Sequence, residues 1–309
     1  MAQSTAQLTG APKKKFSLHN QNVQENIFSY CMLAPDVIGL AVFFFVPILM
    51  ALYLSFHKWD ALTPMVYIGI DNYKTMLGDT QWWQSLGTTL IYTVMFVPMV
   101  FCVSLLMAVL IHSFTGAAGR VFRTLFFVPY AISTVVASLI WRFILDPQRG
   151  FANEILMKLG IGAQDFLGDP KQALLCIAMI SAWMQVGYYC IIFLSALNDI
   201  PTNYYEAARI DGANAFVIFW RITFPLLKEV STFVLVVTTI ASFQVFDLIK
   251  ILTNGGPSGG TNVSVYDIYQ NAFDFMKIGY ASALAFVLFL IIFVISLFQL
   301  RITRGDPNV

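Results

Sequence analysis

Six long apolar stretches constrain the fold of this chain more than any other feature of its sequence. They cover residues 33–56, 86–111, 124–145, 173–197, 230–246 and 281–300. About 20 apolar residues in a helix cross the hydrocarbon core of a bilayer, which is about 30 Å thick. Helices satisfy their own backbone groups there, whereas membrane β-strands would be about ten residues long and alternating. The sequence therefore predicts an all-α membrane protein with six transmembrane helices.

Composition agrees with a membrane protein and excludes several other classes. Hydrophobic residues make up 58% of the chain and charged residues 11%, whereas soluble domains carry about 25% charge. The expected surroundings are therefore membrane lipid, and a net charge of +1 gives no reason to expect a nucleic-acid partner. The four cysteines lie in apolar stretches without paired spacing, so we expect neither a disulfide framework nor a metal site.

The polar ends of the chain suggest its orientation. Residues 1–30 include three consecutive lysines, 13–15, and lack the short apolar core of a signal peptide. Basic residues resist translocation, so we expect a cytoplasmic N-terminal tail. The six-helix domain would then occupy residues 31–304, with a short C-terminal tail, 305–309, also in the cytoplasm. Charge alone leaves the opposite topology open.

A polar segment, residues 198–228, separates the fourth and fifth spans. Asn203 followed three residues later by Glu206 is typical of a helix start with a capping box. Gly212 can adopt a left-handed backbone and turn the chain, and a second short helix is expected over 214–223. The pattern predicts a helix-turn-helix on the inner membrane surface. An amphipathic connector packed against lipid headgroups is the alternative interpretation.

The same segment carries a recognisable signature. Glu206-Ala-Ala is followed by three residues and Gly212, then by nine residues, Ile222, one residue, Phe224 and Pro225. This spacing resembles the coupling loop of binding-protein-dependent ATP-binding-cassette importer permeases, in which a leucine usually stands where Phe224 stands here. The resemblance implies that the loop docks on an ATPase subunit, with Glu206 as the leading charged contact. The implied coupling residues are Glu206, Ala207, Ala208, Asp211, Gly212, Ile222 and Pro225.

Further motifs resemble the carbohydrate branch of that family, of the maltose-transporter type. They lie at residues 69–73, 129–133, 187–189 and 252–257, so the resemblance covers roughly residues 30–304. It implies a heterodimer with a second homologous permease subunit, two cytoplasmic ATPase subunits, and an extracellular or periplasmic solute-binding protein. The implied location is a bacterial or archaeal cytoplasmic membrane.

The chain itself shows no catalytic pattern. It lacks the G-x-x-x-x-G-K-[ST] loop that holds nucleotide phosphates, and no nucleophile–base spacing stands out. We therefore expect a transport subunit without a cofactor of its own, while ATP and magnesium would bind the partner ATPase.

Polar and aromatic residues inside the spans mark an expected solute path, because such groups are costly when they face lipid. Hydroxyl, amide and aromatic groups suit a sugar, and the resemblance places solute-lining positions in the same three helices. Hydrogen bonding between helices is the alternative role. The candidates are Tyr130 and Thr134 in the third span, Gln185 and Tyr188 in the fourth, and Thr238 and Ser242 in the fifth.

Three other functions compete with a sugar importer. They are an ATP-independent secondary transporter, an importer of glycerol-3-phosphate in the same family, and a membrane-embedded enzyme. The coupling signature and the lack of an inverted repeat argue against a secondary transporter, and no catalytic constellation supports an enzyme. The sequence leaves open which solute is carried and which permease subunit lines its path.

Overall fold

A computed structural model describes residues 21–114 and 116–303, and the chain divides into two compact units, residues 1–51 and 52–309. The first unit is helical throughout its described part. α1 (Gln21–Leu40) passes through a π-helical turn, η1 (Ala41–Phe45), into α2 (Val46–Ser55), whose last residues belong to the second unit. Residues 21–30, predicted as part of a polar tail, are therefore helical. Residues 1–20 and the predicted tail 305–309 lie outside the described residues.

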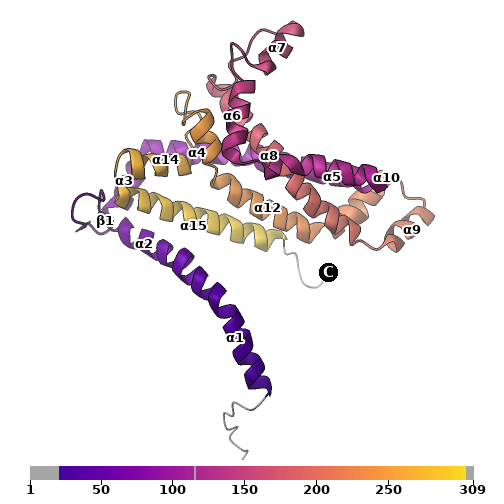
Figure 1. Ribbon diagram of the computed structural model, residues 1–309, viewed down its shortest axis with the longest axis horizontal. Coiled ribbons are helices and arrows are strands. Elements are labelled where there is room, and N and C mark those ends of the chain that lie inside the picture. Colours follow the sequence, from indigo (N-terminus) through magenta and orange to yellow (C-terminus); the bar gives the residue numbers. More distant parts are fainter. Residues whose placement is uncertain (1–20, 115, 304–309) are drawn as a thin grey trace, which may run out of the picture. The chain divides into compact units, whose positions relative to one another are not determined.

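The described part of the second unit consists of helices and loops apart from one antiparallel pair of two-residue strands, in which His57 faces Tyr67. Figure 1 shows the order of its elements along the chain. They are β1 (His57–Lys58), β2 (Val66–Tyr67), α3 (Asp71–Gly78), α4 (Thr80–His112), α5 (Gly116–Ala131), α6 (Thr134–Ile144), α7 (Phe151–Lys158), α8 (Pro170–Asn198), α9 (Thr202–Ile210), α10 (Ala215–Ile218), η2 (Phe219–Thr223), α11 (Phe224–Leu226), α12 (Lys228–Phe243), α13 (Asp247–Leu252), α14 (Ser264–Tyr269), η3 (Gln270–Asp274) and α15 (Ile278–Thr303).

The helices reproduce the predicted set of six spans. Within residues 21–114 and 116–303, five continuous segments are long and apolar enough to cross a membrane, and a bent pair, α5 with α6, makes a sixth. The continuous segments are Phe28–Ser55, Thr80–His112, Pro170–Asn198, Lys228–Leu252 and Ile278–Ile302. The predicted all-α fold with six spans is therefore confirmed, and most helices extend several residues beyond the apolar stretches.

The third span differs from the single helix predicted over 124–145. α5 begins earlier, at Gly116, and a bend of 95° separates it from α6. Pro129 has no backbone N–H and sits in the last turn of α5, where it weakens the helix. Ser133 then takes an extended conformation, with φ −56° and ψ 133°, before α6 starts at Thr134. The span is thus two helices rather than one.

The core of the second unit lies where the long helices meet. α4 packs along α8, α5 packs on the same helix, and α12 packs between α4 and α15. Large apolar side chains that are fully buried fill this core, among them Tyr92, Phe96, Phe193 and Ile177. Tyr92 and Phe96 stack with ring centroids 5.4 Å apart. Because these side chains come from helices that run side by side, burying them fixes the helix arrangement on which the candidate site depends.

Candidate functional site

Four of the predicted solute-lining residues surround one cavity of about 390 Å³. Tyr130 and Thr134 lie on either side of the bend between α5 and α6, and Gln185 and Tyr188 face them from α8. The bend is what brings Tyr130 and Thr134 to the same wall, because it ends one helix and starts the next within three residues. The remaining lining residues are Ile132, Ser181, Met184, Tyr189, Val237 and Leu248.

A glycine sets the distance between the two walls. A Cβ atom added to Gly187 would lie 1.8 Å from the backbone oxygen of Phe126. A side chain is therefore excluded at this position, and α5 approaches α8 backbone to backbone. The close approach lets Tyr130 and Tyr188 stack, with ring centroids 4.6 Å apart and planes 13° apart.

The cavity has the chemistry of a site for an uncharged polar molecule. Among the residues that the structure describes, none that lines it is charged. Tyr130 is 44% exposed, so part of its stacked ring is free to meet a ligand. Tyr189 packs edge-on against Tyr188, with centroids 5.1 Å apart. Aromatic faces beside hydroxyl and amide groups offer both apolar contact and hydrogen bonds.

Thr238 and Ser242, the other two predicted lining residues, do not face this cavity. Both side chains are buried. The Thr238 hydroxyl donates to the backbone oxygen of Val234 at 2.6 Å within α12. The Ser242 hydroxyl lies 2.9 Å from that of Thr93, which links α12 to α4. In this structure the Ser242 hydroxyl links two helices, which is the alternative role that the sequence left open, whereas the Thr238 hydroxyl bonds within its own helix.

Three lining residues of α8 escaped the sequence analysis: Ser181, Met184 and Tyr189. A signal for the first two exists, because residues 181, 184, 185 and 188 follow the three- and four-residue spacing of one helix face. Ser181 also accepts a hydrogen bond from the buried hydroxyl of Tyr92 at 2.8 Å. It therefore anchors the cavity wall to α4.

The segment over 198–228 forms the predicted helix-turn-helix, with two differences at its helix ends. α9 begins at Thr202 after Pro201 and has no side-chain cap, so the capping box at Asn203 was wrong. Pro201 occupies the cap position instead, with an extended backbone of φ −60° and ψ 135°. The second helix does not end before Pro225 but passes through a π-helical turn and continues to Leu226.

Gly212 makes the turn between the two helices, as predicted. Its φ is +78°, and two hydrogen bonds close the helix end around it. The Gly212 N–H donates to the Arg209 oxygen at 3.1 Å, and the Ala213 N–H donates to the Ala208 oxygen at 2.9 Å. This is the Schellman arrangement, which requires a left-handed residue after the last helical turn. Asn214 then caps the next helix by accepting from the Val217 N–H at 2.9 Å.

The turn leaves an open groove of about 400 Å³ beside α9. Four of the predicted coupling residues line it, namely Ala207, Ala208, Asp211 and Ile222, together with Asn203 and Tyr204. Glu206, Gly212 and Pro225 are exposed next to it. A Cβ atom on Gly212 would meet nothing within 4 Å. Glu206 has no ion-pair partner among the described side chains, because the two ion pairs in the described part of the chain join other residues.

No group of three or more residues suited to hold a metal ion occurs in the part of the chain that the structure describes. The predicted site residues that line a hollow thus fall into two separate places. One is an uncharged cavity inside the helices, and the other is an exposed groove on the helix-turn-helix.

Comparison with known proteins places the chain in a family. Residues 81–305 match the family described as binding-protein-dependent transport system inner membrane component. The chain is 35% identical over 277 residues to the sn-glycerol-3-phosphate transport system permease protein UgpA of Agrobacterium fabrum, covering 89% of this chain and 94% of that one. It is 31% identical over 278 residues to the arabinooligosaccharides transport system permease protein AraP of Bacillus subtilis, covering 89% and 88%.

A solved structure shares the fold. A chain in the crystal structure of a bacterial alginate ABC transporter, in complex with alginate pentasaccharide-bound periplasmic protein, superposes with a TM-score of 0.80 at 23% identity. The superposition covers 92% of this chain and 96% of the other. With the family match over most of its length and relatives above 30% identity, this chain belongs to the inner-membrane permease components of binding-protein-dependent ABC transport systems.

Proposed function

We propose that the chain is the permease subunit of an ATP-driven importer that carries a sugar or oligosaccharide across the cytoplasmic membrane by alternating access. The cavity around the stacked tyrosines supports this solute class most directly. Sugars present apolar ring faces and many hydroxyl groups, which match an aromatic pair beside Thr134 and Gln185. The AraP relative, which serves arabinooligosaccharides, supports the same class.

The energy would come from a separate ATPase subunit that docks on the helix-turn-helix. A side chain of such a subunit would fit into the groove beside α9, and a basic group on it would pair with the exposed carboxylate of Glu206. Closure of an ATPase pair would push α9 as a rigid body and tilt α8 and α12, which flank the segment in sequence. Residues 198–228 and both termini would then face the cytoplasm. ATP and magnesium would bind the ATPase, and this chain would bind neither.

The complete importer would contain a second homologous permease, two ATPase subunits and an extracellular or periplasmic solute-binding protein. The related alginate transporter was crystallised with such a periplasmic protein. The second permease would complete the path, and each permease would offer one coupling segment to one ATPase. The predicted lining residues Thr238 and Ser242 would reach the path only if α12 moved, because both are buried here.

Glycerol-3-phosphate is the second candidate solute, because UgpA is a relative at 35% identity. A phosphate ester needs compensating positive charge or several directed donors. No described residue lining the tyrosine cavity is charged. The cavity therefore favours an uncharged solute over the phosphate ester.

Uptake into membrane vesicles tests the proposal. The chain is co-expressed with the second permease, the ATPase and the binding protein of the proposed importer. We expect uptake of a neutral sugar. This uptake should require all partners and should be inhibited by vanadate. Competition by arabinotriose and by sn-glycerol-3-phosphate then separates the two solute classes. Uptake by this chain alone, driven by a proton gradient, would overturn the proposal.

A further inference from the structure

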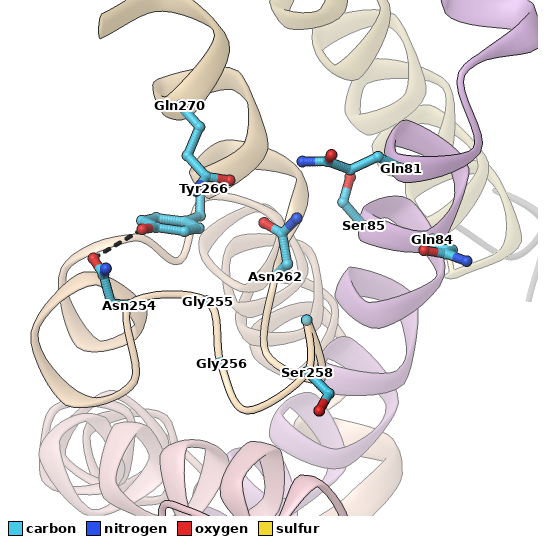
Figure 2. A pocket seen from close by; sticks show the side chains of 11 residues that line it. Gln81, Gln84, Ser85, Asn254, Gly255, Gly256, Ser258, Asn262, Tyr266 and Gln270 are labelled. Atoms are coloured by element: carbon cyan, nitrogen blue, oxygen red, sulfur yellow. Dashed lines mark hydrogen bonds between the residues drawn. The ribbon is translucent and has the colours of Figure 1, made fainter. Parts of the chain in front are cut away.

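A second polar pocket lies at the other end of the helices from the coupling segment. α12 and α13 run from Lys228 to Leu252 and end at a loop over residues 253–263. α4 starts at this end and finishes beside the coupling segment. Its last residue, His112, has Nδ1 3.2 Å from Oδ1 of Asn198, where that segment begins. The loop, the start of α4 and α14 enclose a pocket of about 460 Å³, shown in Figure 2. It is separate from the tyrosine cavity, and the two share no lining residue.

The pocket is lined by hydrogen-bonding groups without charge. Its walls carry the amides of Gln81, Gln84, Asn254, Asn262 and Gln270, one tyrosine ring, and glycines that leave the backbone accessible. None of the lining residues that the structure describes is charged, and none is aliphatic. A surface that only anchors a loop would not need five amide side chains around one hollow. Amides and hydroxyls are the groups that pair with sugar hydroxyls.

Several of these groups keep hydrogen-bonding capacity toward the pocket. Oδ1 of Asn262 is buried and has no hydrogen-bond partner, and a buried acceptor left in this way costs free energy. In Figure 2 the Asn262 and Gln81 side chains point toward each other across the hollow. Nε2 of Gln81 donates to Asp267 at 2.7 Å, which leaves its amide oxygen available. The hydroxyl of Ser258 stands exposed at the rim.

The loop that forms the wall is held in place by its own contacts. The Tyr266 hydroxyl donates to Oδ1 of Asn254 at 2.8 Å, and the hydroxyls of Thr253 and Thr261 lie 2.7 Å apart. A Cβ atom on Gly255 would lie 2.6 Å from the Tyr266 ring, so only glycine lets the backbone lie against that ring. The pocket is thus preorganised, which lowers the entropy lost when a ligand binds.

We propose that this pocket is an outer binding site for a neutral, polyhydroxylated solute, occupied before the solute reaches the tyrosine cavity. The orientation rests on the proposed function, which puts the coupling segment in the cytoplasm and this pocket outside. Asn262 and Gln81 bind solute hydroxyls, while the buried Tyr266 ring supports the loop from behind. The pocket volume falls in the range of small-molecule sites, about 300–1,000 Å³.

Protection from thiol labelling tests the site in the complex of both permeases and both ATPase subunits, reconstituted in nanodiscs without the binding protein. In a background with the four native cysteines replaced, Ser258→Cys puts a thiol at the pocket rim. Gln148→Cys, exposed near the end of α6, is the matched control. The probes are glucose, arabinotriose, maltotriose and sn-glycerol-3-phosphate at millimolar concentration, with a membrane-impermeant maleimide. A sugar at about three times its Kd should slow labelling of Ser258→Cys about fourfold and leave the control unchanged.

Asn262→Ala in the same background should abolish this protection, while uptake with all partners present persists at reduced affinity. Protection by none of the three sugars overturns the proposal, as does protection by sn-glycerol-3-phosphate alone. Protection that requires docked binding protein and is independent of sugar also overturns it, and assigns the pocket to that protein. Vanadate-sensitive sugar uptake measured in parallel reports on the proposed function separately. The outer site can therefore fail while the importer assignment stands.

Discussion

The rings of Tyr130 and Tyr188 stack across the contact between α5 and α8, with centroids 4.6 Å apart. Two features of the chain make this possible. Gly187, next to Tyr188, removes the side chain that would separate the helices, and the bend after Ala131 frees the last turn of α5. The pair forms an aromatic wall beside Thr134 and Gln185. Changing either ring should therefore affect the solute more than the fold.

Tyr188→Ala should raise the KM for uptake about three- to tenfold, because an aromatic contact contributes about 0.5–1.5 kcal/mol beyond its buried area. Tyr188→Phe keeps the ring and should change KM much less. Uptake kinetics in vesicles with all partners present measure both. Phe143→Ala, an exposed apolar residue of α6 outside the cavity, is the control. An unchanged KM in Tyr188→Ala would remove the tyrosine pair from the solute path.

The sequence predicts which types of side chain line the cavity better than it predicts which of these side chains point into it. Thr134 and Thr238 are both hydroxyl residues in apolar spans, yet only Thr134 faces the cavity. Thr238 bonds to the carbonyl oxygen four residues earlier, which any threonine in a helix can do. Which face of a helix meets its neighbours depends on packing between spans that are far apart in sequence. Residue type alone does not contain that information.

The bend in the third span shows a similar limit. Pro98 lies inside α4, which continues through it as one helix of 33 residues, whereas the span containing Pro129 breaks. Both prolines remove the same backbone hydrogen bond. What differs is the surrounding packing: α4 lies along α8 for much of its length, while α6 leaves toward α7 and α13. The number of spans follows from apolar length, but the break depends on tertiary contacts.

Gly187→Ala should destabilise the protein, because its Cβ would lie 1.8 Å from the Phe126 oxygen and force α5 away from α8. Overpacking of this kind costs about 1–3 kcal/mol. Gly87→Ala is the matched control, since it lies in α4 with nothing within 4 Å of the added atom. The apparent unfolding temperature of the purified protein in detergent should fall for Gly187→Ala and stay level or rise for Gly87→Ala. Equal changes in the two variants would mean that α5 and α8 do not meet in this way.

Gly212 offers a way to separate the turn from the docking surface. Gly212→Asn should retain most transport, because asparagine tolerates the left-handed backbone that the turn needs. Gly212→Leu should abolish transport, since it adds both backbone strain and bulk where the segment is open. Membrane insertion, complex assembly and solute-stimulated ATP hydrolysis are measured for both variants. Wild-type transport by Gly212→Leu would contradict docking of an ATPase at this turn.

Glu206→Lys tests the charge next to that turn. Glu206 is exposed and makes no ion pair among the described residues, so the folded permease should tolerate the change. Docking should suffer, because reversing a charge at an interface places like charges together or loses a pair. We expect the variant to insert normally into the membrane and to co-purify with less ATPase than the wild type does. If charge repulsion causes the loss, it should be greater at low salt. Asp274→Lys, exposed in η3 and also without an ion pair among the described residues, is the charge-matched control.

Asp267 gives the protein a predictable response to pH. Its carboxyl is fully buried, and burial, together with the nearby charge of Asp79, raises its pKa from 3.8 to about 6, although hydrogen bonds from Gln81 and Asn262 oppose the shift. The folded protein therefore holds this proton more tightly than the unfolded chain. The resulting stabilisation is fully present below about pH 4 and is lost as pH rises through about 6.

Asp267→Asn should remove that pH dependence and make the protein more stable at neutral pH, by about 3 kcal/mol, because an amide carries no charge to bury. The substitution retains an oxygen to accept from Gln81, whose amide lies 2.7 Å from Oδ1. Unfolding temperatures of the purified protein between pH 4 and 8 measure the effect. Asp274→Asn, exposed in the same segment, should leave the profile unchanged. Parallel pH profiles for wild type and Asp267→Asn would show that Asp267 is already ionised in the folded protein at low pH, and that burial does not hold its proton.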